Sequence, residues 1–88
     1  MQADGWVPYE WSDEEVAEAI AYLKAKYPEA WKESEELEIA TGDLREAPSA
    51  NIEMGALSLA YKKSFDHRDI IFLYGEIRNA RRANLGLK

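Results

Sequence analysis

Cysteine is absent from this chain of 88 residues, and histidine occurs once, as His67. Without cysteine there is no disulfide framework, no thiolate nucleophile and no zinc site built on sulfur. A single histidine beside Asp66 and Asp69, at an expected helix start, supplies neither a Ser-His-Asp arrangement nor a metal site. We therefore expect no catalytic residues, no bound metal and no cofactor.

Long apolar runs and glycine-rich segments are missing as well. The longest apolar run covers residues 70–74, far short of the ~20 residues that a membrane-spanning helix needs. No glycine-rich phosphate loop and no Glu-x-x-His pair for a di-metal carboxylate site occur. The opening residues 1–5 are polar and lack the basic and then apolar pattern of a signal peptide. We expect a cytoplasmic protein without a membrane partner.

What the chain does contain is typical of a small globular protein. Hydrophobic residues make up 47% and charged residues 32% of the sequence, which is outside the range of disordered chains. The length allows one domain with room for three or four short helices. We predict an all-α fold, a compact bundle of three to four short helices over residues 12–86, preceded by an extended aromatic arm over residues 1–11.

The first helix is predicted most clearly. Ser12 and Glu15 have the spacing of a capping box, and Trp11 and Val16 that of a hydrophobic staple. An apolar stripe then recurs at helical spacing until Pro28 ends the helix. The members of this stripe are Val16, Ala19, Ile20, Leu23 and Tyr27.

The middle of the chain is less regular. Pro28 suits the first position of a second helix, which we place from Pro28 to about Thr41 with Gly42 as its stop. Residues 37–41 alternate between apolar and polar side chains, so a short strand is the alternative there. A third helix follows the loop 42–50, with Ser49 or Asn51 as its expected cap, and runs to about residue 64. It is apolar on most sides, which is typical of a central or interface helix.

The fourth helix repeats the start signal of the first. Asp66 is the expected cap, Asp69 stands at the third helical position, and Phe65 and Ile70 form the staple. Gly86 is a suitable stop. Because the connection to the third helix is short, we expect the third and fourth helices to form a central antiparallel hairpin.

Charge is distributed unevenly along the chain. Residues 1–53 carry fourteen acidic and four basic residues, a net charge of −10, whereas residues 54–88 carry three and seven, a net charge of +4. Such a division indicates either that the halves attract each other or that they face different partners. Within the acidic half, Glu14 and Glu18, and likewise Glu29 and Glu33, are like-charge pairs that each cost a helix ~0.2–0.5 kcal/mol.

These features favour a non-enzymatic protein–protein interaction module, acting as a small acidic inhibitor, adaptor or accessory subunit on a larger protein. Small phage or bacterial inhibitors have this size and charge without sharing a motif with the chain. The acidic surface would steer a basic partner, and the arm would supply aromatic contacts, since Trp and Tyr are frequent hot-spot residues. The expected partner-binding residues are Trp6, Tyr9, Trp11, Glu14, Glu18, Glu29 and Glu33. The other interpretation of the arm is that it covers the bundle's own core.

Two further expectations concern other partners. Arg78, Arg81 and Arg82 in the fourth helix form an alternative basic surface, which would suit a nucleic-acid-associated or virion-assembly component. The net negative charge of the same small body makes nucleic acid the less favoured partner. The apolar excess of the third and fourth helices, finally, predicts a homodimer.

Overall fold

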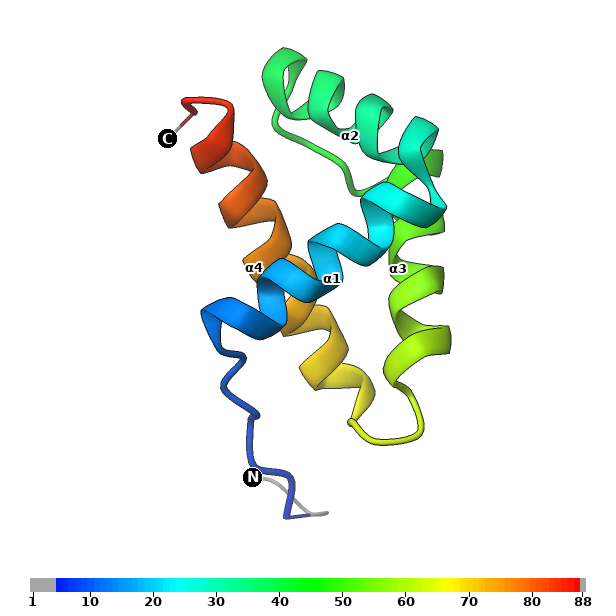
Figure 1. Cartoon of the computed structure of the whole chain (residues 1–88), viewed down its shortest axis with the longest axis vertical. Coiled ribbons are helices and arrows are strands. Elements are labelled where there is room, and N and C mark those ends of the chain that lie inside the picture. The colour runs from blue at the N-terminus through cyan, green and yellow to red at the C-terminus, as the bar shows by residue number, and fades with distance from the viewer. Residues whose placement is uncertain (1–4, 88) are drawn as a thin grey trace.

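The computed structural model describes residues 5–87, and within that range the chain forms helices and no strand. The helices are α1 (Asp13–Lys26), α2 (Pro28–Ala40), α3 (Pro48–Tyr61) and α4 (His67–Asn84). The all-α bundle with an α3–α4 hairpin is therefore confirmed (Figure 1). Residues 1–4 of the predicted arm lie outside the described residues.

Helix α1 begins as its sequence predicts. The Ser12 side chain accepts a hydrogen bond from the Glu15 backbone N–H, and the Glu15 carboxylate accepts one from the Ser12 N–H, so the capping box is complete. Its buried face consists of Val16, Ala19 and Leu23. Only Tyr27 separates α1 from α2, which starts with Pro28 in the first turn.

Residues 37–40 belong to α2, so the helical interpretation of this segment is confirmed and the strand alternative is wrong. The helix ends where the backbone N–H groups of Thr41 and Gly42 both donate to the Leu37 carbonyl. Gly42 has a φ of +71°, in the left-handed region that glycine occupies without strain. That turn directs the chain into the loop 41–47, which returns to α3.

The predicted caps of α3 are wrong. The helix starts at Pro48, its N-cap is Ala47 without a side-chain hydrogen bond, and it ends at Tyr61. Pro48 suits the first position because its missing N–H would be unpaired there. The Ser49 hydroxyl instead points inward and pairs with the Ser34 hydroxyl on α2 at 2.9 Å. The Ser49 hydroxyl therefore takes part in the packing of α2 against α3 and does not cap the helix.

Helix α4 starts at the predicted cap, since the Asp66 side chain accepts from the Arg68 N–H. In Figure 1, α3 and α4 form an antiparallel pair, α1 crosses in front of α4, and α2 lies at the end of the bundle opposite the α3–α4 turn. Each helix contacts the other three. Their buried apolar residues form one core cluster, whose fully enclosed members include Ala19, Leu23, Leu57, Leu73 and Ile77.

Candidate interaction surfaces

The N-terminal arm lies along the start of α4 and is fastened there by Asp69. One carboxylate oxygen of Asp69, Oδ1, accepts from the Trp6 indole N–H at 3.2 Å and from the Tyr9 backbone N–H at 2.9 Å. The Asp69 backbone carbonyl accepts from the Trp11 indole N–H, also at 2.9 Å. Asp69 is buried, so its side chain serves the arm and does not complete the capping box that its position suggested.

Aromatic rings close around the same point. The Trp6 ring stacks on Phe72 with centroids 6.0 Å apart, and the Arg68 guanidinium lies 4.2 Å from the Trp6 centroid. Tyr9 and Trp11 meet edge to face at 4.8 Å, and Phe65 contacts both of them within 5 Å. The ring geometries are those that aromatic pairs favour.

The arm is therefore packed on its own bundle, which is one of the two interpretations of its aromatic residues. The indole N–H groups of Trp6 and Trp11 are used inside the molecule and are half-buried. An apolar margin remains exposed next to them. It comprises Val7 and Tyr9 of the arm and Ile71 and Phe72 of α4.

The arginines in the C-terminal half of α4 pair with buried acids. Arg81 is 1% exposed and donates to Glu53 Oε1 through both terminal nitrogens, at 3.3 and 3.1 Å. Arg78 forms a two-point contact with Glu38, at 3.1 and 2.9 Å, and Arg82 reaches the same carboxylate at 3.4 Å. The prediction that Arg81 belongs to a basic surface is wrong, and Arg78 and Arg82 share one buried acid, Glu38.

Glu53 is the centre of a polar cluster that links three helices. Its Oε1 accepts from the Tyr74 hydroxyl at 2.7 Å and from the Ser34 hydroxyl at 3.0 Å, in addition to Arg81. The Arg81 guanidinium also lies 4.3 Å from the centre of the Trp31 ring. Within residues 5–87, Glu53 Oε2 is buried without a hydrogen-bond partner. Burial raises the pKa of the Glu53 carboxyl despite these donors.

Acidic residues occupy the outer faces of α1 and α2. Glu14 and Glu18 on α1, and Glu29 and Glu33 on α2, are all exposed, as the sequence predicts. The structure does not gather these four residues into one site, because they lie on two helices and only Glu33 borders a groove. They form a broad acidic surface.

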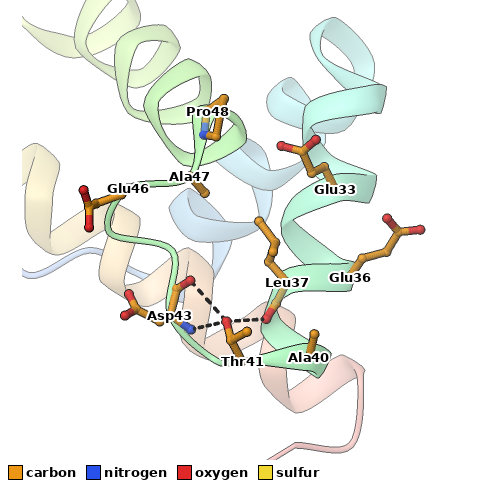
Figure 2. Close-up of a pocket in the computed structure, with 9 residues that line it drawn as sticks. All are labelled: Glu33, Glu36, Leu37, Ala40, Thr41, Asp43, Glu46, Ala47 and Pro48. Atoms are coloured by element: carbon orange, nitrogen blue, oxygen red, sulfur yellow. Dashed lines mark hydrogen bonds between the residues drawn. The ribbon is translucent and has the colours of Figure 1, made fainter.

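The groove lies between the C-terminal half of α2 and the loop that leads to α3. It has a volume of about 680 Å³. Figure 2 shows Glu33 and Glu36 on the α2 side and Asp43 and Glu46 on the loop side, with Leu37 and Ala47 between them and the side chains of Glu36 and Glu46 directed outward. The apolar residues that line the groove are Leu37, Ala40, Ala47 and Pro48.

Thr41 closes one end of the groove and fixes the loop to the helix. Its hydroxyl contacts the Leu37 carbonyl at 3.2 Å and accepts from the Asp43 N–H at 3.0 Å, as the dashed lines of Figure 2 show. Asp43 in turn forms an ion pair with Arg45 at 2.9 Å. Hydrogen bonds from Arg45 lower the pKa of Asp43 to about 2, and the positive charge of Arg45 offsets the negative charge of the Asp43 carboxylate.

Of the residues that line this groove, sequence analysis named Glu33 alone as a binding residue and missed the others. The available signal was the irregular apolar pattern of α2, in which Leu37 and Ala40 do not align with Trp31. In the structure Trp31 is buried, whereas Leu37 is half-buried and Ala40 exposed at the groove. Leu37 and Ala40 therefore lie off the buried face of α2 and form a second apolar surface that faces outward.

Within residues 5–87, no group of three or more His, Asp or Glu side chains is arranged to hold a metal ion. No helix in that range is both long and apolar enough to cross a membrane. His67 is exposed in the first turn of α4. Comparison of the chain with protein families, with curated proteins and with solved structures found no match.

Proposed function

We propose that this protein is a non-enzymatic interaction module that binds a larger, basic protein through the acidic surface of α1 and α2. In this proposal it acts as an inhibitor, adaptor or accessory subunit in the cytoplasm. Glu14, Glu18, Glu29 and Glu33 steer the encounter, because exposed charges act mainly on the rate of association. The aromatic arm contributes through its exposed margin, since the indole N–H groups already bind Asp69.

The observation that carries the proposal is which charged side chains are buried in the bundle and which are exposed on its surface. Arg78, Arg81 and Arg82 of α4 pair with the buried acids Glu38 and Glu53. Most other acids of α1 and α2 are on the outside, with three lysines among them. The exposed acids of these helices are Asp13, Glu14, Glu18, Glu29, Glu33 and Glu36, and the exposed bases are Lys24, Lys26 and Lys32. A surface with this excess attracts cationic partners and repels anionic ones.

The same observation weighs against the nucleic-acid alternative. Phosphate binding needs exposed cations that release counterions. Arg81 is enclosed, and the side chains of Arg78 and Arg82 are 27% and 29% exposed beside Glu38. A nucleic-acid role for this basic surface would therefore have to rely on the partly exposed Arg78 and Arg82, without Arg81.

The test has two arms. Immobilised protein is used to capture partners from the native host, and the partner identified by mass spectrometry is then purified for kinetics. Reversal of Glu14, Glu18, Glu29 and Glu33 to Lys is expected to slow association about tenfold or more and to flatten its salt dependence, with dissociation changed little. Reversal of Glu10 and Glu76, which are exposed on the arm and on α4, is the control and is expected to have a much smaller effect.

The second arm is a gel-shift assay with duplex and single-stranded nucleic acid at two salt concentrations. The wild-type protein is expected to leave both unshifted. A shift that weakens steeply with salt would contradict the proposal and favour the basic helix as the working surface. An unchanged association rate after the fourfold reversal would contradict it as well.

A further inference from the structure

We propose that the groove between α2 and the loop 41–47 binds a short amphipathic segment of the partner, with apolar side chains on its floor and Lys or Arg side chains against its two walls. This inference depends on the proposed function, in that it names the part of the basic partner that is recognised. It also assigns the contact to a single place, whereas the acidic surface as a whole sets only the rate of encounter.

The floor of the groove suits apolar side chains. Ala40 and Ala47 have small side chains, and Leu37 contributes one side of its chain to the core and the other to the groove. The volume of about 680 Å³ lies within the ~300–1,000 Å³ that is usual for binding pockets. Burial of apolar surface there would give the complex its stability, at roughly 25 cal/mol for each Å² removed from water.

The walls require positive charge. Glu33 and Glu36 lie on one side and Glu46 on the other, and none of the described residues that line the groove is basic. Arg45 compensates only Asp43. The C-terminal end of α2 also lies at the groove, and the negative end of a helix dipole attracts cations. A bound segment thus needs basic groups on both flanks of its apolar side chains.

The same features argue against other occupants. A metal ion would need ligands gathered around one point, and the described residues contain no such group. A second copy of the chain carries a net charge of −6, so self-association through an acidic groove is opposed by repulsion. An amphipathic helix that lays its apolar face into a groove is a common mode of peptide recognition. A basic segment of that kind matches both the floor and the walls.

The test uses a fluorescein-labelled synthetic peptide of about 14 residues, or about four helical turns, with leucines at helical i, i+3, i+4 and i+7 spacing and lysines elsewhere. Fluorescence anisotropy measures affinity, and amide NMR shifts locate the peptide. Binding to the wild-type protein is expected to shift the amides of Leu37, Ala40 and Ala47. Two control peptides, one with lysine replaced by glutamate and one with leucine replaced by serine, are expected to bind at least about tenfold more weakly.

Protein variants separate the groove from the general acidic surface. Glu33→Lys/Glu36→Lys is expected to weaken binding about tenfold or more, whereas Glu14→Lys/Glu18→Lys, an equal charge change outside the groove, is expected to weaken it less than threefold. Ala40→Tyr fills the groove and is expected to abolish detectable binding, whereas Ala21→Tyr on the exposed face of α1 leaves it unchanged. Circular dichroism verifies that each variant folds.

Three results would overturn the inference. These are equal losses from the two charge-reversed pairs, undiminished binding to Ala40→Tyr, and no binding of the lysine peptide by the wild-type protein. The proposed function would still hold in each case if the association rate of a captured basic partner depended on Glu14, Glu18, Glu29 and Glu33. Loss of that dependence would instead remove the proposed function itself.

Discussion

At the scale of single residues, the structure is organised around two buried carboxylates, Glu53 and Asp69. Glu53 joins α2, α3 and α4 through Ser34, Tyr74 and Arg81. Asp69 joins α4 to the arm. A buried acid is tolerated only when donors surround it, and removal of one member leaves the others without partners.

Glu53 predicts a pH dependence that can be isolated by mutation. Because burial raises its pKa above the usual 4.5, the folded protein binds this proton more tightly than the unfolded chain does. The unfolding free energy of the wild type should therefore fall relative to that of Glu53→Gln as pH rises from about 4.5 through the folded-state pKa, and the difference should be flat above that value. Urea denaturation of both proteins from about pH 4 to about pH 8 measures it. The other carboxylates are common to both proteins. A wild-type unfolding free energy that rises with pH relative to that of Glu53→Gln would contradict the raised pKa of Glu53.

Because the Asp69 side chain binds the arm, we expect that its substitution releases the arm without unfolding the bundle. Asp69→Ala removes the acceptor of the Trp6 and Tyr9 N–H groups, and we expect a loss of about 1–3 kcal/mol in unfolding free energy. Acrylamide quenching of tryptophan fluorescence and proteolysis of the arm should both increase. Trp6→Phe keeps an aromatic ring next to Phe72 and removes the indole N–H that donates to Asp69, so its effect should be smaller. Equal protection of the arm in Asp69→Ala and in the wild type would show that the aromatic contacts alone hold it.

At the scale of the helices, the termini are set by local chemistry. Ser12 and Asp66 each accept a backbone hydrogen bond at the start of a helix. Gly42 provides the positive φ that ends α2 and turns the loop toward the groove. Each of these helix termini is stabilised by residues a few positions away. We therefore expect substitutions at different termini to change the unfolding free energy nearly independently.

The two caps yield one prediction. Ser12→Ala and Asp66→Ala are each expected to lower the unfolding free energy by ~0.5–2 kcal/mol, the usual range for a lost N-cap. Chemical denaturation measures both. Ser64→Ala, at an exposed hydroxyl in the α3–α4 turn, is a control that should change little. An unmoved denaturation midpoint in both cap variants would mean that neither cap supports its helix.

The glycines yield a second prediction with opposite signs. Gly42→Ala places a Cβ at positive φ and 3.3 Å from the Arg82 guanidinium, and we expect a loss of about 1–2 kcal/mol. Gly55 lies inside α3, and a Cβ there meets nothing within 4 Å, so Gly55→Ala should stabilise the protein by about 0.5–1 kcal/mol. Thermal denaturation of the two variants should move the midpoint in opposite directions, and a shift of the same sign would contradict the assignment.

At the scale of the whole molecule, ion pairs lie inside the bundle, and most other acids of α1 and α2 lie on its surface. Some apolar side chains are exposed as well. Leu59 is 68% exposed on α3, and Ile71 is 47% exposed on α4. Both lie away from the acidic groove. We propose that these exposed apolar side chains would form the contact of the homodimer that the sequence predicts.

Sedimentation velocity tests the homodimer. We expect association that strengthens with protein concentration and with salt, because salt screens the repulsion between copies of net charge −6. Leu59→Ser/Ile71→Ser is expected to shift the equilibrium toward monomer, whereas Ala21→Ser on α1 is not. A strict monomer at high micromolar concentration would contradict the prediction.

The sequence alone determined where most helices begin and end. The capping box of α1, the proline start of α2, the glycine stop at Gly42 and the Asp66 cap all depend on residues within four positions of one another, so a linear pattern contains them. The α3 start was predicted wrongly although Pro48, like Pro28, is a local signal for the first helical position. Tertiary structure decided only that the Ser49 hydroxyl bonds to Ser34 and does not cap the helix.

Only the tertiary structure decided which charges are available to a partner. Arg81 and Glu53, or Arg78 and Glu38, are far apart in the chain, and no local pattern shows that they meet in the core. The groove likewise needs α2 and the loop to face each other before Glu33 and Glu46 can form its two walls. A side chain's charge is written in the sequence, but its exposure is set by the elements that pack against it, and exposure decides whether that charge stabilises the fold or recruits a partner.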